Sequence, residues 1–259
     1  MSANLLGALD SYRQQAGQSS LQGRLIKQCA SDNSECTVLY SHCLPGEICE
    51  VIRKEASLAE RAKYTLEWKV YDHDTPSNLK ELLLLAGFTP GPVESVMALR
   101  LSEKALDLFK SSAYEIRPIR DPKCLVDVAA ISREIGRPNI EEEQRRLALA
   151  LQEDPEQMSV YVAYIDDEPV ACGRIYFDQD SKIAELSGGR TKTTRRKQGL
   201  YNALVRARLM EAIRRRCKYV FVDALPTSEP ILKKRGFEFL VHTQPFIYQP
   251  KPLTGKMGY

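Results

Sequence analysis

The chain has 259 residues, of which 43% are hydrophobic and 27% charged, as in an ordinary globular protein with one large core or two modest ones. Its net charge of +3 argues against nucleic acid as a partner of the whole molecule, so such a role would need a local basic patch. No apolar run approaches the length of a membrane span, and residues 1–10 lack the features of a signal peptide. We therefore expect a cytoplasmic protein without a membrane partner.

The cysteines argue against two kinds of structural site. They are odd in number and show no CxxC spacing: Cys29, Cys36, Cys43, Cys49, Cys124, Cys172 and Cys217. A disulfide framework and a zinc ribbon are both poor explanations of this pattern. Three of the cysteines cluster loosely around His42, but free thiols in a reducing cytosol are the simpler interpretation. We expect no metal.

The first thirty-odd residues are polar and rich in Gln and Ser, which favours a helix followed by a loop. Beyond them, the patterns predict strands over 36–43, 66–71 and 93–101, and helices over 51–64 and 76–86. Thr75 and Pro76 read as the cap and first residue of the second helix, which Gly87 ends.

A second run of elements begins near Tyr114, after Ser111 and Ser112. Asn139 and Glu142 form a capping-box-like helix start, and a hairpin turn is expected over 166–169. The predicted strands cover 114–119, 160–165, 170–177, 183–188 (with 191 as the alternative end), 219–224, 237–241 and 245–248; the predicted helices cover 125–135, 139–153, 199–217 and 228–235. Trp68 is expected in a core.

A weak repeat links the two runs. A strand over 67–72, a helix and the pair Gly87-Phe88 are matched by a strand over 220–223, a helix and Gly236-Phe237. We interpret the match as a duplication. Chance is the competing explanation, because this order of elements is common in α/β proteins.

The chemically informative segment is 184–201, in which a strand leads through a basic loop and a glycine into a helix. Unpaired N–H groups and the helix dipole create an anion site at such a junction. Its cations are Arg190, Lys192, Arg195, Arg196 and Lys197. A pyrophosphate suits the site, whereas a solvated basic turn is the alternative. The helix arginines Arg206, Arg208, Arg214, Arg215 and Arg216 are interpreted as a solvated face.

This segment resembles the pyrophosphate loop of the GNAT superfamily of N-acetyltransferases. That loop has Arg or Gln, two residues, Gly, one residue, then Gly or Ala; here it reads Arg196-Lys197-Gln198-Gly199-Leu200-Tyr201. The order of elements over 114–249 agrees with the family as well. The resemblance implies an α/β fold with a mixed, mostly antiparallel sheet flanked by helices. We expect two tandem GNAT-like halves: a degenerate N-terminal domain without a phosphate loop (1–112), and a GNAT acetyltransferase domain (113–259).

The resemblance also implies a reaction: transfer of an acetyl group from acetyl-CoA, the cosubstrate, to an amine of a small molecule or protein. Pantetheine would pair with the strand 185–191, and pyrophosphate would bind the loop that follows. The implied cofactor-binding residues are Gly189, Thr191, Arg196, Lys197, Gln198, Gly199, Leu200 and Tyr201. Glu185 is the candidate general base, because its spacing to Arg196 resembles that of the catalytic glutamate in several members. Its alternative role is a simple ion pair.

Two residues depart from the family pattern. Tyr201 stands where Gly or Ala is usual, and Leu232 stands where many members have the Tyr that protonates the leaving thiolate. Tyr201, Tyr248 and water remain alternative proton donors. The missing Tyr favours a second hypothesis, a non-catalytic acyl-CoA-binding sensor or assembly module. A third is an aminoacyl-tRNA-dependent transferase, which a continuous basic surface from Arg206 to Arg216 would favour. An oligomer is compatible with the sequence.

Overall fold

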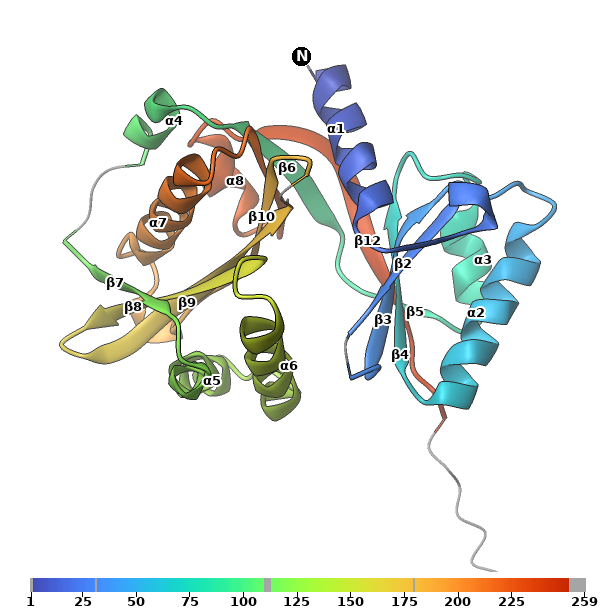
Figure 1. Cartoon of the computed structure of the whole chain (residues 1–259), viewed down its shortest axis with the longest axis horizontal. Helices are drawn as coiled ribbons and strands as arrows, with labels where there is room; N and C mark the ends of the chain where they lie inside the picture. The colour runs from blue at the N-terminus through green and yellow to red at the C-terminus, as the bar shows by residue number, and fades with distance from the viewer. Residues whose placement is uncertain (1, 31, 110–112, 179, 252–259) are drawn as a thin grey trace, which may run out of the picture. The chain divides into compact units, whose positions relative to one another are not determined.

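The computed structural model describes residues 2–30, 32–109, 113–178 and 180–251. Contacts divide the chain into two compact units, drawn in Figure 1. The N-terminal unit comprises Leu6–Glu94 and the chain from Val241 onward. The C-terminal unit comprises Ser95–Leu240 and the first residues, up to Leu5. Within the described residues, no helix is both long and apolar enough to cross a lipid bilayer.

The C-terminal unit is a sheet covered by helices on both faces. Its strands are ordered β6 (Glu94–Arg100), β11 (Tyr219–Ala224), β10 (Ile183–Thr191), β9 (Glu168–Asp178), β8 (Met158–Ile165) and β7 (Glu115–Ile119). Only the pair of β10 with β11 is parallel; the other neighbours are antiparallel. The parallel pair needs a crossover connection, which helix α7 (Leu200–Arg214) provides.

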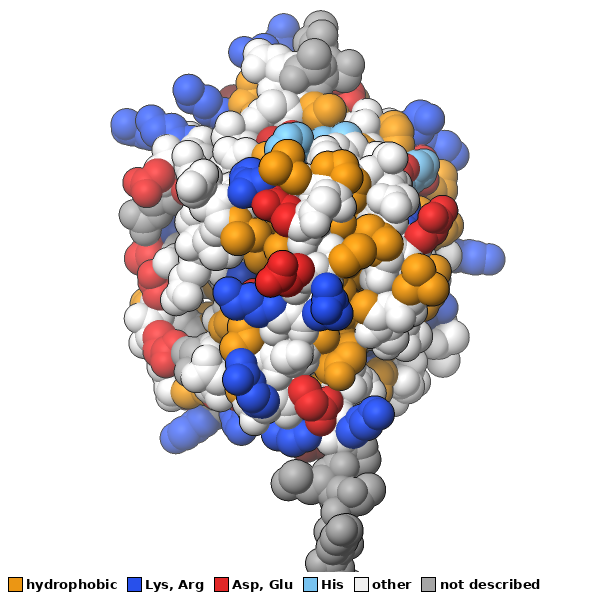
Figure 2. Space-filling model, turned by 90° about the vertical axis from the view of Figure 1, so that its right-hand side faces the viewer, with side chains coloured by type: hydrophobic (Ala, Val, Ile, Leu, Met, Phe, Trp, Pro, Cys, Tyr) orange, Lys and Arg blue, Asp and Glu red, His pale blue; other side chains and the backbone are white. Residues whose placement is uncertain are grey.

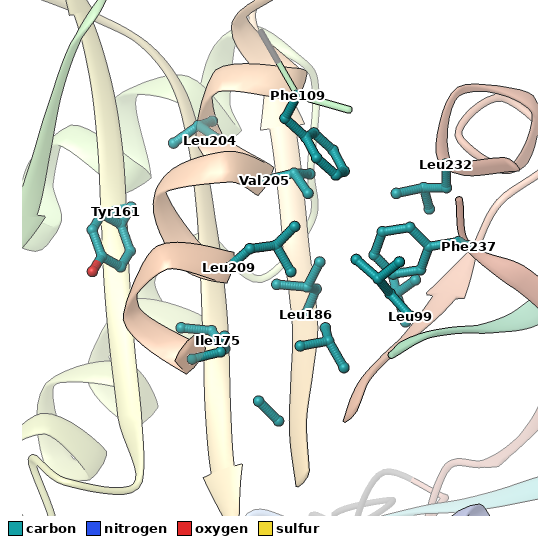
Figure 3. Close-up of a cluster of buried hydrophobic side chains, with 14 of the residues drawn as sticks. Leu99, Phe109, Tyr161, Ile175, Leu186, Leu204, Val205, Leu209, Leu232 and Phe237 are labelled. Carbon is teal, nitrogen blue, oxygen red and sulfur yellow. The ribbon is translucent and has the colours of Figure 1, made fainter. Parts of the chain in front are cut away.

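Alternate residues of these strands enter two separate cores. On one face, α7 packs over Tyr161, Ile175 and Leu186 (Figure 3). On the other, α5 (Leu125–Glu134) and α6 (Ile140–Glu153) pack over a second set of strand residues that includes Val160 and Val162. This alternation follows from the two-residue period of a strand. Two short helices, α4 (Glu103–Asp107) and α8 (Glu229–Lys233), complete the unit.

The N-terminal unit repeats part of this plan. Its strands are ordered β1 (Gln18–Ser20), β2 (Leu25–Cys29), β3 (Glu35–Ser41), β4 (Thr65–Tyr71) and β12 (Glu238–Tyr248), with β5 (Thr89–Pro90) also on β12. Again a single pair, β3 with β4, is parallel, and it is connected by helix α2 (Ile48–Ala62). Helices α1 (Ser2–Gln15) and α3 (Leu79–Leu85) flank the sheet, and Trp68 is fully buried in the core, as expected.

The last strand of each run of elements explains why the units are not continuous in sequence. Strand β6 follows α3 along the chain but pairs with β11, whereas β12 follows α8 and pairs with β4. The observed division falls at Glu94/Ser95 and Leu240/Val241. The boundary expected after residue 112 lies beside Ser111 and Ser112, outside the described residues.

Most predicted elements are present, with three local corrections. The final two strands are one strand, β12. Helix α3 begins at Leu79 and not at Pro76, so Thr75 does not cap it; Asn78 precedes the helix and makes no side-chain capping hydrogen bond. Asn139 does precede α6, but it adopts a left-handed conformation with φ 54° and its side chain makes no capping hydrogen bond. The hairpin between β8 and β9 turns on Asp166 and Asp167, both at positive φ.

The polar N-terminal segment also holds more structure than its composition indicated. A hairpin of β2 and β3 places Cys29 directly opposite Cys36, and the two form a disulfide. The expectation of free thiols is therefore wrong for this pair. It holds for the other cysteines, Cys43, Cys49, Cys124, Cys172 and Cys217.

Candidate functional site

The central feature of the C-terminal unit is the separation of its two parallel strands. Strands β10 and β11 pair only from Ile183 to Leu186, although β10 continues to Thr191. Past Leu186 the pairing of β10 with β9 also shifts, across a bulge between Ser187 and Arg190. Gly188 lies in the bulge at φ 60°, a conformation that glycine adopts without strain. The edge of β10 that faces β11 is thereby released from the sheet beyond Leu186.

Helix α7 begins next to this released edge. Gly199 precedes it at φ 88°, and the helix starts at the buried Leu200. The N–H groups of the first helical turn have no acceptor within the helix, so they point outward together with the positive end of the helix dipole. Tyr114 donates from its hydroxyl to the carbonyl of Gln198 over 2.7 Å and fixes the loop just before the glycine.

The five cations of this segment differ in what they contact. Arg190 binds Glu143 through both terminal nitrogens, at 2.6 and 2.7 Å. Lys192 and Arg195 both bind Glu168, at 2.7 and 3.1 Å. In the described part of the chain, Arg196 and Lys197 form no salt bridge; the Arg196 Nε lies 3.5 Å from the carbonyl of Thr191. Both side chains are exposed, so they are the cations of the loop that remain available to an anion.

Glu185 lies on the paired part of β10, between Tyr176 of β9 and Phe221 of β11. It is half-buried, and it faces away from α7 because its neighbours Ala184 and Leu186 enter the core under that helix. Its face is the one covered by α5 and α6. A carboxylate therefore stands one residue before the point where β10 leaves β11, on the face opposite α7.

Sequence comparison agrees with this geometry. Residues 126–237 match the Acetyltransferase (GNAT) family. The matched range begins at the second residue of α5 and extends beyond α8, so it includes the separated strands and the basic loop. Residues 126–237 form a GNAT domain. A search of curated proteins finds no significant match to the chain.

Solved structures show that the fold extends over both units. A GCN5-related N-acetyltransferase from Kribbella flavida superposes with a TM-score of 0.64 at 16% identity, covering 98% of this chain and 97% of that one. A tandem GNAT protein from the clavulanic acid biosynthesis pathway gives a TM-score of 0.60 at 14% identity, covering 85% and 76%. A protein of unknown function from Staphylococcus epidermidis superposes with a TM-score of 0.62 at 14% sequence identity, covering 85% of this chain and 86% of that one. The N-terminal half thus also resembles a GNAT fold.

The two departures from the GNAT pattern have distinct structural explanations. Leu232 is fully buried and packs with Leu99 and Phe237 in the core beside α7 (Figure 3). Tyr201 lies in the first turn of α7, and its ring covers Gly189 on the released edge of β10. A Cβ atom on Gly189 would come within 3.1 Å of the Tyr201 Cε2. The absence of a side chain at position 189 therefore makes room for the ring at position 201.

A buried ion cluster on the α5/α6 face of the GNAT domain was missed by sequence reasoning. Glu143 of α6 accepts from Arg174 over 2.7 Å and also binds Arg190. Burial raises the pKa of Glu143, but the hydrogen bonds and charges of the two arginines outweigh it and lower that pKa to about 2. Glu143 follows Glu141 and Glu142 in sequence, so nothing local distinguishes it.

Arg208 corrects the expectation of a solvated arginine face on α7. Its side chain is only 1% exposed and lies against Gly173, within 3 Å of where a Cβ atom would be. It donates to the backbone carbonyls of Leu204 and Arg174, at 3.0 and 2.9 Å, and lies 3.4 Å from that of Ser187. Burial lowers the pKa of Arg208 to about 10. This arginine therefore contacts the backbone of both β9 and β10 next to the bulge.

The N-terminal unit shows the same strand separation with a different occupant. Strands β3 and β4 pair only from Glu35 to Val38, and β3 then continues to Ser41. Arg13 of α1 fills the place beyond: its guanidinium donates to Asp74 at 2.7 and 2.9 Å. It also lies 3.6 Å from the ring centre of Tyr71.

The start of α2 in the N-terminal unit also differs from the start of α7, because a glutamate stands where α7 has a glycine. Glu47 precedes the helix, and its carboxylate accepts from the backbone N–H of Leu44 and binds Arg24. A negative charge at this helix start opposes the binding of a phosphate.

The side of the unit that carries α2 and α3 displays Lys and Arg interspersed with Asp and Glu (Figure 2). In neither unit do the described residues gather three or more His, Cys, Asp or Glu side chains into a group suited to a metal ion.

Proposed function

We propose that the C-terminal unit transfers an acetyl group from acetyl-CoA to a primary amine. The observation that carries this proposal is the release of β10 from β11 after Leu186, next to the start of α7. A released strand edge offers backbone groups that need hydrogen-bond partners, and pantetheine supplies two amides. The first turn of α7, with Arg196 and Lys197, offers an anion site for the pyrophosphate.

The residues present fit this cosubstrate. Gly199 leaves the helix start without a side chain, so that a phosphate can approach the backbone closely. The three other cations of the loop are held by Glu143 and Glu168, and they support the loop's shape instead of binding the ligand. Gly189 and Thr191, on the released part of β10, are the proposed backbone contacts for pantetheine.

Glu185 is the proposed general base. An alkylammonium acceptor is protonated at neutral pH, and it must lose a proton before its nitrogen can attack a thioester. A carboxylate beside the point of strand separation is suited to take that proton, directly or through a water molecule. The acceptor would approach from the α5/α6 face, which Glu185 shares.

The test is turnover of acetyl-CoA with a panel of primary amines by wild-type protein and Glu185→Gln. We expect the variant to lose ~10²–10⁴-fold in kcat, because the amide keeps the shape but cannot accept the proton. The loss should be smallest at high pH, where more amine is already neutral, and CoA binding should persist. Glu153→Gln, an exposed position on α6, is the matched control. Equal turnover of Glu185→Gln and wild type at neutral pH would refute the role.

A non-catalytic acyl-CoA sensor is the second candidate, and the burial of Leu232 favours it, since no hydroxyl stands at that position. Stable CoA binding without turnover of any amine would support the sensor. The aminoacyl-tRNA-dependent transferase is less well supported. Arg208 lies in the interior and Arg215 is paired with Glu156 and Glu211, which interrupts the basic surface that this hypothesis needs.

A further inference from the structure

The bulge in β10 is made of glycines on both strands. Gly188 and Gly189 of β10 lie opposite Gly173 of β9, directly after the register pair Ser187–Arg174. Glycine has the greatest backbone freedom of all residues and no side chain to pack, so these residues do not fix the shape of the bulge by themselves. The edge of β10 is nevertheless released from β11 at this place. The shape of the bulge must therefore come from contacts with other residues.

Two of these glycines leave room for arginine side chains. A Cβ atom on Gly188 would lie 2.9 Å from the Cζ of Arg174, and one on Gly173 would lie 2.8 Å from the Cζ of Arg208. Arg208 reaches the bulge from α7, whereas Arg174 binds Glu143 of α6 and so lies on the opposite face of the sheet. The glycine bulge is thus enclosed between two guanidinium groups.

Glu143 connects the two ends of the bulge. Its carboxylate accepts from the Nη1 of Arg174 over 2.7 Å and from both terminal nitrogens of Arg190, at 2.6 and 2.7 Å. Arg174 pairs with the last residue of β10 before the bulge, and Arg190 is the first residue paired after it. The side chains of Arg174, Glu143 and Arg190 are 15%, 17% and 9% exposed, so solvent screens these ion pairs little. One carboxylate of α6 therefore holds the bulge at both ends.

The remaining contacts of the two arginines are neutral, and each reaches one end of the bulge. The Nη2 of Arg174 lies 3.5 Å from the Oγ of Ser187, and its buried Nε has no hydrogen-bond partner. The Nη1 of Arg190 also donates to the Oγ of Ser132 over 2.6 Å. Among the described residues, no carboxylate other than Glu143 forms a salt bridge with either arginine. A neutral residue at position 143 would leave the two ends of the bulge without a bridge.

We propose that Glu143 is a positioning residue for the pantetheine arm of CoA in the acetyl transfer proposed above, on which this inference rests. By bridging Arg174 and Arg190, it holds the bulge in the shape that presents the released edge of β10 to pantetheine. The backbone groups proposed for this contact belong to Gly189, within the bulge, and to Thr191, next to Arg190. Without the bridge, the glycines let the bulge relax and these groups lose their alignment.

The phosphate site depends on different contacts. The basic loop before α7 is held by Glu168, which binds both Lys192 and Arg195. The N–H groups of the first turn of α7 are positioned by the helix itself. Loss of the Glu143 carboxylate should therefore weaken recognition of pantetheine and spare recognition of the pyrophosphate.

The experiment compares the binding of CoA and of ADP by calorimetry, because ADP carries a pyrophosphate without pantetheine. Glu143→Gln should bind CoA roughly tenfold more weakly than wild type, as expected when one or two hydrogen bonds are misaligned, and should bind ADP equally well. In turnover with the amine panel, its KM should rise by the same factor for acetyl-CoA and for S-acetylpantetheine, with kcat nearly unchanged. Glu141→Gln, an exposed position on the same helix, is the matched control.

A second variant separates misalignment of the bulge from general loss of stability. Glu143→Gln combined with Arg190→Gln restores the net charge of the ion cluster, so it should recover part of the thermal stability and still bind CoA weakly. Wild-type affinity for CoA in either variant would overturn the role of Glu143. Equal losses of affinity for CoA and ADP would overturn it as well, because they would indicate a general disturbance of the site.

The same measurements distinguish failure of this inference from failure of the proposed function. If wild type binds no CoA, both proposals fail. If wild type binds CoA and acetylates no amine, the acetyl transfer is overturned, and selective loss of CoA affinity in Glu143→Gln would support the positioning role in a CoA-binding module. If wild type turns over and Glu143→Gln keeps the wild-type KM for both thioesters, only the role of Glu143 is refuted.

Discussion

The Nε of Arg13 donates to the carbonyl oxygen of Leu39 over 2.9 Å. Leu39 is the first residue of β3 beyond its pairing with β4, so Arg13 satisfies a backbone group that the strand separation releases. The equivalent position in the C-terminal unit is Ser187, the first residue of β10 beyond its pairing with β11. An arginine reaches this carbonyl in both units, because Arg208 lies 3.4 Å from that of Ser187. The units differ in their other contacts: Arg13 also binds Asp74 beside its gap, whereas a basic loop and a glycine-preceded helix lie beside the other.

This contrast predicts one CoA per chain. The N-terminal gap is filled by Arg13, and Glu47 places a negative charge at the start of α2. Isothermal titration calorimetry with CoA should give a stoichiometry of one. Two equivalent sites would contradict the comparison of the units.

Arg13 is also predicted to be essential for stability. Its side chain is 3% exposed and its partner Asp74 is 2% exposed. Removing the arginine alone in Arg13→Met leaves a buried carboxylate without its ion partner, at a cost of about 3–5 kcal/mol. The double variant Arg13→Met with Asp74→Asn should recover part of that loss. Urea unfolding of the single and double variants measures both effects, and a single variant as stable as wild type would show that the pair is dispensable.

Arg196 is predicted to bind the phosphates. CoA at about 100 times its Kd should stabilise the wild-type protein by roughly 2.7 kcal/mol. Arg196→Glu should abolish most of this stabilisation, because the side chain is exposed and forms no salt bridge in the described part of the chain. Thermal shift with CoA is the measurement, and Lys54→Glu on α2 is a control with the same charge change. A full shift in Arg196→Glu would remove this residue from the site.

The lowered pKa of Glu143 predicts that the folded protein loses part of its stability in acid. Because its pKa is lowered from 4.5 to about 2 in the folded protein, its contribution to stability is fully present above pH 4.5 and is lost as the pH falls toward 2. A shift of this size corresponds to about 3 kcal/mol. Unfolding by urea across this pH range should show a steeper loss in wild type than in Glu143→Gln, which starts less stable since Arg174 and Arg190 lose their shared carboxylate. If the stability of wild type and of Glu143→Gln fell equally steeply with pH, the loss could not be assigned to Glu143.

The sequence by itself determined the order of the elements and the position of the anion loop. Both depend on local features: the alternation of strand residues, the helical period after Gly199, and glycines where the backbone takes positive φ. It also indicated the repeat of strand, helix and Gly-Phe, and both runs do form a parallel strand pair joined by a helix.

Tertiary structure decided what the local pattern left open. The chain gives no local signal that β6 pairs with β11 or that β12 pairs with β4, because strand pairing is fixed by contacts between distant residues. Likewise, Arg208 reads as a surface residue until the missing side chain of Gly173 makes room for it inside. Of the five cations that looked alike in the basic loop, three are bound by Glu143 and Glu168, which come from other elements. Which charges remain available to a ligand is therefore a property of the fold, since a carboxylate distant in sequence neutralises a cation only when the chain brings the two together.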